Sequence, residues 1–408
     1  METILQGIDL KNIDRSKWRS YRFDEIAKNI SERVDPNDTD LQVYVGLEHI
    51  DSESLHIKRT GTPDDVNGTK LRCYPGDIIF GRRRAYQRKA AIATFDGFCS
   101  AHSLVLRANP AVIHPKLFPF FIHSDLFMNR AVDISVGSLS PTINWGTLKT
   151  QEFHLPPLEE QERLGRLLWR IDHLIEQEHK LLNKITRGQY VYFNRSITSG
   201  IYFDEENAKY KSIVYPKSWT VFHLKELLSS LRNGISEEQN LNEKGIKVTR
   251  IETISESVIN IKNVGFIDTT RDYSKYKLDV GDILFSHINS VAHIGKVALY
   301  KEHVDLYHGV NLMRLKADPS LIRYTFLHYL LDNKPAKRFY ERRAKQAINQ
   351  ASLDQSDIGS LPLAIPILKV QDLIIKKMEY FDTSISGVNS KLNASKSLQK
   401  ALINQIFG

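Results

Sequence analysis

The feature that most constrains the fold of this chain is an internal duplication. Five short stretches of its first half return, in the same order, in its second half. The matched residues are 18–26 with 219–227, 75–80 with 280–285, 106–110 with 315–319, 143–148 with 348–353, and 155–161 with 365–371. The offset drifts only from 201 at the first pair to 210 at the last. This period is far too long for a solenoid repeat, so the sequence predicts two copies of a whole domain with its connector.

Length and composition agree with a globular protein of several domains. The chain has 408 residues, of which 41% are hydrophobic and 25% charged, and this balance argues against disorder. No apolar run approaches the ~18–20 residues that span a bilayer, and only two cysteines are present, Cys73 and Cys99. We therefore expect no membrane segment, reduced buried thiols and a cytoplasmic location. The net charge of +8 permits nucleic-acid binding without establishing it.

The first part of each copy reads as short strands bounded by Gly, Pro, Asn and Asp, with helices between them. The strand-like stretches are 42–45, 77–80, 90–94 and 103–107 in copy one, and 247–251, 282–285, 296–300 and 311–315 in copy two. Helical patterns cover 115–129 and 321–343. This mixture predicts an α+β domain with a mainly antiparallel or mixed sheet.

The second part of each copy reads as one long helix with a heptad seam. Apolar residues alternate in steps of four and three, which is typical of a coiled coil. The seam residues are Leu164, Leu168, Ile171, Ile175, Leu182 and Ile185 in copy one, and Ile374, Met378, Phe381, Ile385, Val388 and Leu392 in copy two. The predicted organisation is domain 1 at 1–157, a spacer helix at 158–198, a linker and domain 2 at 199–366, and a second spacer helix at 367–408. An amphipathic helix lying on a globular domain is the alternative to two helices packed on each other.

Two related domains on a spacer suit the reading of two separate patches of one polymer. Duplex DNA is such a polymer, because spaced half-sites match spaced reading domains. If the two helices pair antiparallel, a pseudo-twofold axis relates the copies and matches the local twofold of the duplex. Since the copies have diverged, the duplication predicts an asymmetric bipartite target.

The order of motifs also points to a family. In both halves a tryptophan precedes a Gly-Asp-Ile-[Ile/Leu]-Phe strand, an Ile-Asn segment and a proline-marked start of the long helix. This order resembles the specificity subunit of type I restriction–modification enzymes over nearly the whole chain. The most specific stretch is 155–162 with the later Ile171-Asp172 pair, and the next is 281–285. Copy two departs from the pattern at Ile367 and at 369–370.

The resemblance implies a function and a set of partners. In that family the globular parts are target-recognition domains, and the helices form an antiparallel coiled coil that docks methyltransferase subunits. The resemblance implies a non-catalytic subunit that binds double-stranded DNA, two methyltransferase subunits and, in restriction-competent complexes, two restriction or motor subunits. AdoMet, ATP and Mg²⁺ would then be bound by those partners, and this chain would hold no cofactor or metal.

In copy one, the candidate DNA contacts are a basic segment directly after the 77–80 strand and a polar segment further on. Guanidinium groups bind phosphate oxygens or the guanine edge bidentately, and Ser, Thr or Asn can pair with several base edges. The candidates are Arg82, Arg83, Arg84, Tyr86, Arg88, Lys89, Ser140, Thr142 and Asn144. A solvated loop is the alternative for the basic segment, and a turn or cap role is the alternative for Asn144.

In copy two, the equivalent segment is polar and a basic stripe follows it. Lys334, Lys337, Arg338, Arg342 and Lys345 fall at helical spacing, which predicts one cationic helix face. The candidate DNA contacts are His287, Asn289, Ser290, Lys296, Lys337, Arg338, Arg342, Lys345, Gln346, Asn349 and, more weakly, Arg250. A solvated face, or a turn for Asn349, is the alternative.

Familiar catalytic motifs are missing from the sequence. There is no Asn-Pro-Pro-Tyr or Asp-Pro-Pro-Tyr/Phe tetrapeptide, no phosphate-binding Gly-x-x-x-x-Gly-Lys-Ser/Thr loop and no His-Glu-x-x-His pair. A DNA-specificity subunit is therefore the leading hypothesis. A DNA-modifying enzyme with divergent motifs, and a coiled-coil assembly protein whose domains bind protein, are the two alternatives.

Overall fold

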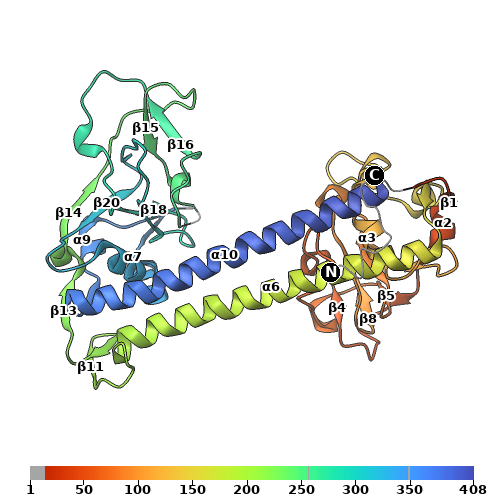
Figure 1. Ribbon diagram of the computed structural model, residues 1–408, viewed down its shortest axis with the longest axis horizontal. Helices are drawn as coiled ribbons and strands as arrows, with labels where there is room; N and C mark the ends of the chain where they lie inside the picture. Colours follow the sequence, from red (N-terminus) through yellow and green to blue (C-terminus); the bar gives the residue numbers. More distant parts are fainter. Residues whose placement is uncertain (1–13, 256, 348–349) are drawn as a thin grey trace. The chain divides into compact units, whose positions relative to one another are not determined.

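The duplication produces two compact units that share a pair of long helices. The computed structural model describes residues 14–255, 257–347 and 350–408 (Figure 1). Unit 1 contains the described residues up to Leu182 together with Gly387–Gly408, and unit 2 contains Asn183–Ser386. Both divisions fall inside the long helices α6 (Leu158–Ser199) and α10 (Leu368–Phe407). Each unit therefore includes one part of each helix, and neither spacer helix is a domain of its own.

Unit 1 is built on two four-stranded sheets. The first has the order β2-β9-β6-β7 and is antiparallel throughout, and the second has the order β3-β5-β8-β4, in which β4 and β8 are parallel. The strands are β1 (Arg19–Arg22), β2 (Ala27–Ile30), β3 (Arg33–Val34), β4 (Tyr44–Val45), β5 (Lys70–Cys73), β6 (Ile78–Gly81), β7 (Ala90–Ile92), β8 (Gly97–Cys99), β9 (Ser103–Ala108) and β10 (Glu152–Leu155). The helices are α2 (Phe23–Ile26), α3 (Phe118–His123), α4 (Asp125–Asp133) and α5 (Trp145–Leu148). The outer pair β1–β10 closes the unit just before α6 begins.

Unit 2 repeats this plan with a smaller second sheet. Its main sheet, β14-β20-β17-β19, corresponds to the first sheet of unit 1, and only the two strands β15 and β16 replace the second sheet. The strands are β11 (Asn207–Tyr210), β12 (Ile213–Pro216), β13 (Thr220–His223), β14 (Leu228–Asn233), β15 (Ile246–Thr249), β16 (Val264–Ile267), β17 (Ile283–Phe285), β18 (Ile288–Asn289), β19 (Val297–Leu299), β20 (Met313–Ala317), β21 (Lys345–Ala347), β22 (Gln350–Ser352) and β23 (Pro362–Ile365). The helices are α7 (Tyr324–Asp332), α8 (Lys334–Glu341) and α9 (Gln355–Gly359). All eight strand stretches read from the sequence overlap observed strands, so the α+β prediction is confirmed.

The core of unit 1 combines residues from both ends of the chain. Phe121 stacks edge-on against Phe153 and against Phe407, with ring centroids 5.2 and 5.3 Å apart. Leu402 and Ile406 of α10 are buried in the same cluster. Because α10 carries these apolar side chains at its far end, burying them stabilises its attachment to the sheet and helices of unit 1. Unit 2 takes Phe193 of α6 into its core in the corresponding way.

A buried glutamine fixes the start of each long helix. The Gln161 side chain donates to the carbonyls of Pro156 (2.8 Å) and Val112 (3.0 Å) and accepts from the backbone N–H of His114 (2.7 Å). Gln371 makes the same three bonds in unit 2, to Pro366 (2.9 Å), to the carbonyl of Leu321 (3.0 Å) and from the N–H of Arg323 (2.8 Å). Since a buried polar group must be bonded, this pattern explains why both copies keep a glutamine five residues after the proline whose carbonyl it binds.

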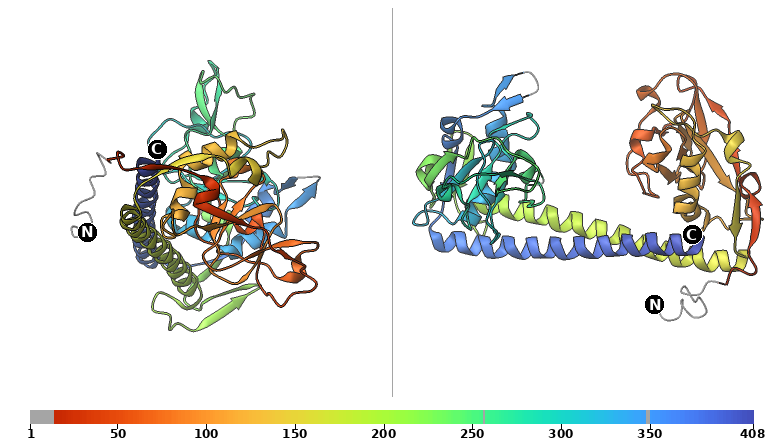
Figure 2. Two further views of the ribbon diagram at one scale, coloured as in Figure 1. Left: turned by 90° about the vertical axis from the view of Figure 1, so that its right-hand side faces the viewer. Right: turned by 90° about the horizontal axis from the view of Figure 1, so that it is seen from above.

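The two helices pair along the seam expected from the heptads. In both units the α6 segment lies beside the α10 segment (Figures 1 and 2). In unit 2 the rings of Tyr192 and Phe381 lie 6.0 Å apart, and Gln189 donates to Asp382 at 2.5 Å. Residue numbers therefore rise along one helix as they fall along the other, so the pair is antiparallel. The seam residues named above are all buried or half-buried.

Two local expectations were wrong. The stretches 115–129 and 321–343 are not single helices, because Ser124 and Asn333 adopt extended backbone angles and accept from the helix that follows, from Phe127 N–H and Lys334 N–H. Helix α8 ends at Glu341, so Lys345 lies in strand β21 instead of on the expected helix face.

The alignment of residues 143–148 with 348–353 was also wrong. The N–H of Ile143 donates to the carbonyl of Arg82, and the equivalent bond in unit 2 runs from Leu353 to His287, both at 2.9 Å. The partner of Ile143 is therefore Leu353, at the offset of 210 that also holds for the next pair, 155–161 with 365–371. Among the described residues no helix is long and apolar enough to cross a membrane, and both cysteines are free and buried.

Candidate nucleic-acid interface

The basic segment of unit 1 is a tight turn held rigid by its backbone. We call residues 82–89, between β6 and β7, the arginine turn. Its centre is a single 3₁₀ turn, Ala85–Gln87, flanked by Arg84 (φ 54°) and Arg88 (φ 50°) in the left-handed region. Ala85 is buried, whereas Arg83, Arg84 and Tyr86 are exposed, Tyr86 by 56%. Left-handed backbone at residues other than glycine is costly and persists where the surroundings impose it, often at functional sites.

Two cations of the arginine turn face inward. The Arg88 guanidinium pairs with Asp125 at 2.5 Å and with Glu53 at 3.3 Å, and Lys89 Nζ donates to the carbonyl of Leu47 at 2.6 Å. Arg82 is half-buried, and its backbone N–H donates to the carbonyl of His102. Among the sequence candidates in this turn, Arg83, Arg84 and Tyr86 are therefore the side chains that the fold leaves open to a ligand.

The polar candidates of copy one lie beside the turn. Arg84 donates its N–H to the carbonyl of Pro141 at 2.7 Å, and Arg83 forms a β-bridge with Thr142. Ser140 and Thr142 are half-buried, whereas Asn144 is exposed at the N-cap of α5. The structure thus joins two segments that are nearly 60 residues apart in the sequence into one exposed edge.

A histidine that the sequence reading missed supports the same edge. His102 Nε2 lies 3.2 Å from Arg83 Nη1. Burial, and then the neighbouring guanidinium groups of Arg83 and Arg82, lower the pKa of His102. The ring is therefore neutral near pH 7 and accepts from Arg83, which orients that guanidinium. No local pattern marks His102, because only the fold brings it to the turn.

In unit 2 the equivalent loop, residues 286–296, offers small polar groups. His287 is buried, and burial lowers its pKa to about 4, so it is neutral and enclosed. Asn289 donates to the Ser286 hydroxyl at 3.1 Å, and Lys296 Nζ donates to the carbonyl of Ser255 at 2.5 Å. Ser290 is exposed. Of the four candidates in this loop, Ser290 is therefore the one that reaches solvent without an internal side-chain bond to a neighbouring residue.

A three-stranded sheet carries this loop together with the basic segment of unit 2. β18 pairs with β22, and β22 pairs with β21. Gln346 in β21 is exposed, and so are Arg338 on α8 and Arg342 at its C-cap. The remaining candidates have internal partners: Lys337 pairs with Asp332 at 2.7 Å, Lys345 with Asp354 at 3.0 Å, and Arg250 with Glu252 at 3.2 Å. Asn349 lies outside the described residues.

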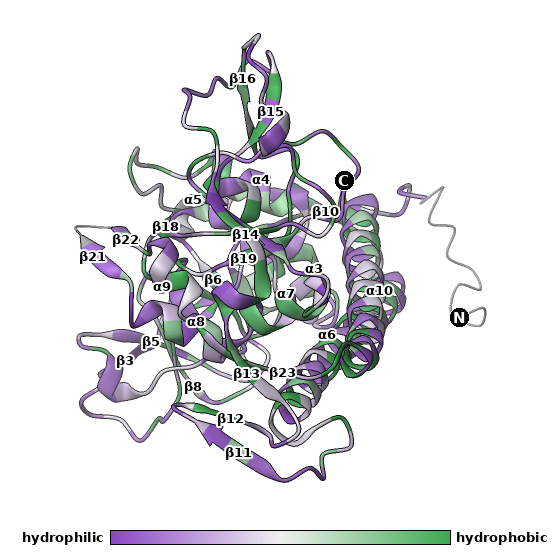
Figure 3. Ribbon diagram, turned by 90° about the vertical axis from the view of Figure 1, so that its left-hand side faces the viewer, coloured by the Kyte–Doolittle hydropathy of each residue, from purple (hydrophilic) through white to green (hydrophobic). Residues whose placement is uncertain are grey.

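The long helices expose a second kind of surface. Their seam residues point into the pair or into the unit cores, with Leu164 and Leu168 at most 1% exposed. Hydrophilic and hydrophobic residues are mixed along both helices (Figure 3), and several large apolar side chains are exposed. The exposed ones are Leu174, Leu181, Tyr190 and Val191 on α6, and Leu373, Tyr380 and Leu398 on α10. A macromolecular partner would meet these residues and not the seam. Among the described residues no cluster of His, Cys, Asp and Glu could hold a metal ion.

Comparison with known proteins finds one family model and several similar specificity subunits. The family model of the type I restriction modification DNA specificity domain matches residues 15–187 and 216–395. The putative type I restriction enzyme MjaX specificity subunit of Methanocaldococcus jannaschii is 38% identical over 210 residues, which are 50% of this chain and 49% of that protein. The type I restriction enzyme StySPI specificity subunit of Salmonella potsdam is 25% identical over 337 residues, 80% of this chain and 70% of that protein.

The fold comparison agrees with the sequence comparisons. A crystal structure of a type I restriction-modification S subunit from M. genitalium matches 97% of this chain and 98% of its own, with a TM-score of 0.59 at 14% identity. The chain spans about half the length of the M. jannaschii relative. The family model nevertheless matches twice and covers most of both units. This chain therefore belongs to the family of type I restriction modification DNA specificity domains.

Proposed function

We propose that this chain is the DNA-specificity subunit of a type I restriction–modification complex and reads an asymmetric, bipartite duplex target. The observation that carries the proposal is the repeated exposed edge beside β6 and β17. In unit 1 this edge presents guanidinium groups, and in unit 2 it presents amide and hydroxyl groups with separate arginines. Two edges of the same origin and different chemistry suit two half-sites of different sequence.

The exposed side chains of the two edges differ in chemistry and suit different parts of duplex DNA. Arg84 is fixed by its backbone bond to Pro141 and carries its charge into solvent, so it suits a phosphate or a guanine edge. Tyr86 adds an exposed ring for stacking or for a bond to phosphate. In unit 2, Gln346 suits adenine, and Arg338 and Arg342 suit the backbone.

In the proposed function, partner subunits dock on the long helices and catalyse the reactions. Methyltransferase subunits would dock on the outer faces of α6 and α10, where Leu174, Leu181 and Tyr380 are exposed. Methyl transfer and DNA cleavage would be reactions of those partners and of restriction subunits, which would also bind AdoMet, ATP and Mg²⁺. This chain would then contribute recognition and assembly without catalysing a reaction.

The test is the salt dependence of binding to duplex DNA. Each phosphate contact that is lost lowers the slope of log affinity against log salt by about one. We expect Arg84→Ala and Arg83→Ala to weaken binding of the full chain and each to flatten this slope by about one unit. Arg59→Ala is the control, because Arg59 is also exposed but pairs with Asp51. Unchanged slopes for both turn variants would reject the assignment of this edge to DNA.

A further inference from the structure

We infer that the loop of residues 51–58, which we call the clamp loop, holds the arginine turn in place against both long helices. Glu53 and Arg88 of unit 1, and Lys400 of α10, are then positioning residues for the first half-site. The inference rests on the proposed function, because it concerns how the arginine turn is presented to DNA. Nothing in the sequence pairs these three residues, which are brought together only by the fold.

The first step is the contact between the clamp loop and the arginine turn. Ser52 Oγ donates to the carbonyl of Gln87 at 2.7 Å, and the N–H of Glu53 donates to the carbonyl of Arg88 at 3.2 Å. The Glu53 carboxylate also accepts from the Arg88 guanidinium. Gln87, the last residue of the 3₁₀ turn, and its cap Arg88 are thus bonded to the clamp loop through both backbone and side chains.

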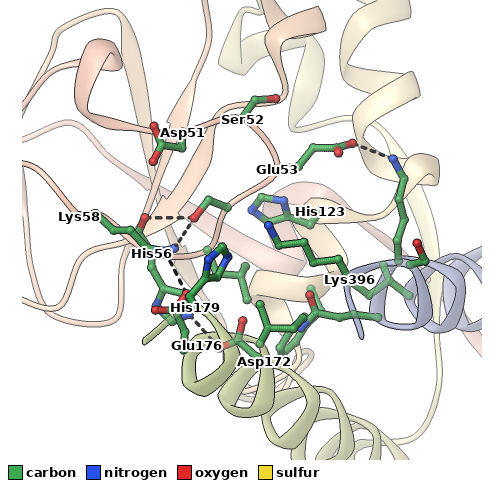
Figure 4. Close-up of a pocket in the computed structure, with 18 residues that line it drawn as sticks. Asp51, Ser52, Glu53, His56, Lys58, His123, Asp172, Glu176, His179 and Lys396 are labelled. Atoms are coloured by element: carbon green, nitrogen blue, oxygen red, sulfur yellow. Dashed lines mark hydrogen bonds and ion pairs between the residues drawn. The ribbon is translucent and has the colours of Figure 1, made fainter. Parts of the chain in front are cut away.

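The second step is the contact with α10. Lys400 Nζ donates to the same Glu53 carboxylate at 2.8 Å, an ion pair drawn in Figure 4. Asp125, the other partner of Arg88, accepts from Asn404 Nδ2 at 2.5 Å and donates its N–H to Asn404 Oδ1 at 2.9 Å. Two routes of charged and polar contacts therefore lead from Arg88 to neighbouring turns of α10.

The third step is the contact with α6. His56 Nε2 lies 2.8 Å from Asp172 Oδ2, and Lys58 Nζ lies 3.1 Å from Glu176 Oε1, one helical turn further on (Figure 4). Asp172 is buried. The clamp loop thus contacts both helices and the arginine turn, and these contacts surround a cavity of about 500 Å³ lined also by His123, His179 and Lys396.

The clamp loop and the arginine turn also contain residues with strained backbone angles. Of the residues other than glycine with left-handed φ, three lie here: Glu53 (φ 54°), Arg84 (φ 54°) and Arg88 (φ 50°). Glu53 and Arg88 are joined to each other, and Arg84 begins the exposed turn. Because such conformations persist only where contacts impose them, the ion pairs of Glu53 and Arg88 are the contacts that maintain the turn.

Unit 2 also bonds to a long helix, but it lacks the ion pairs that link the arginine turn of unit 1 to α10. In unit 1 the N–H of Gly81 donates to the carbonyl of Lys89, and in unit 2 the N–H of Ser286 donates to the carbonyl of Lys296, both at 2.8 Å. Lys296 is therefore the counterpart of Lys89, and the residue before it, Gly295 (φ 77°), is the counterpart of Arg88. Asn333 donates to Asn194 of α6 at 3.2 Å, which replaces the Asp125–Asn404 contact. With glycine in place of arginine, unit 2 cannot form the same coupling. The positioning effect should therefore be confined to the first half-site.

The experiment selects sequences from a random duplex library with the full-length chain and compares variants. Arg83→Ala combined with Arg84→Ala identifies the half-site that unit 1 reads, because the contacts that position the arginine turn on that half-site are lost. Lys400→Met should reduce preference at that same half-site about three- to tenfold, leave the other half-site unchanged and leave the salt slope unchanged. Lys396→Met is the matched control, since Lys396 is exposed on the same helix and pairs with no carboxylate among the described residues.

The double variant Arg88→Ala with Lys400→Met should lose no more preference than Arg88→Ala alone, because both act along one route. A salt slope that falls by about one in Lys400→Met would instead make Lys400 a direct phosphate contact and overturn the inference. Equal losses in Lys400→Met and Lys396→Met would also overturn it. If the double variant Arg83→Ala with Arg84→Ala leaves both the salt slope and every base preference intact, the proposed function of the arginine turn fails instead.

Discussion

At the scale of single residues, the structure separates side chains that the sequence groups together. The arginine turn reads as one cationic stretch, yet Arg88 is neutralised by Glu53 and Asp125 whereas Arg84 is exposed. The same contrast occurs in unit 2 between His287, which is buried, and Ser290. A run of like charges predicts a binding segment, but the direction of each side chain depends on carboxylates that lie far away in the sequence.

The His56–Asp172 pair gives a prediction at this scale. The hydrogen bond to Asp172, with help from Glu176, raises the pKa of His56 against the opposing effects of burial and Lys58. Protonated His56 therefore stabilises the fold, fully below its unfolded pKa of about 6.5, and this contribution is lost as pH rises through the folded value. The difference in unfolding free energy between the wild-type chain and His56→Gln should be largest near pH 5.5 and shrink above neutrality. Urea denaturation at several pH values measures it, and a difference that grows with pH would contradict the assignment.

At the scale of elements, the long helices have two different apolar faces. The heptad seam is buried between the helices and in the unit cores, and a thinner set of apolar residues points outward. The sequence shows the seam clearly because its period is regular. The outer residues have no period, so only burial distinguishes them from the seam.

Two leucines of α6 test the difference between the buried seam and the exposed apolar residues. Leu168 is fully buried and Leu174 is 46% exposed. Leu168→Ala should lower the free energy of unfolding by about 2–5 kcal/mol, because it leaves a cavity, and Leu174→Ala should change it by less than about 0.5 kcal/mol. Leu174→Glu combined with Leu181→Glu should abolish copurification with methyltransferase while the chain stays folded by circular dichroism. Intact copurification of this double variant would place the docking surface elsewhere.

At the scale of the whole molecule, duplication followed by divergence accounts for the two proposed recognition edges in one chain. The elements that repeat most closely attach each unit to the helices: the β1–β10 and β13–β23 pairs and the bonds of Gln161 and Gln371. The elements that differ most are the second sheet and the loops at the exposed edges. Divergence is therefore concentrated where DNA would be read.

Each unit should therefore determine the base preference at its own half-site, independently of the other unit. Gln346→Ala and Arg338→Ala change exposed side chains of unit 2 that make no contact with unit 2 core residues among the described hydrogen bonds and ion pairs. Combined, they should relax base preference at one half-site by about 1–3 kcal/mol and leave the half-site that depends on Arg84 unchanged. Sequencing of methylated sites from cells that carry the variant measures both. A uniform loss at both half-sites would indicate a role in assembly and not in reading.

Periodic and local signals determined much of this protein from its sequence alone. The duplication, the strands, the seam and the proline-marked helix starts were all readable, because strand alternation, heptads and turn residues act over a few positions. The breaks at Ser124 and Asn333 are local N-caps, which accept from Phe127 N–H and Lys334 N–H. The pairing of Ile143 with Leu353 and the inward direction of Arg88 were decided only by the tertiary structure. Each depends on partners tens of residues away, such as Arg82 for Ile143 and Asp125 for Arg88, and a backbone bond or an ion pair of this kind leaves no trace in local spacing.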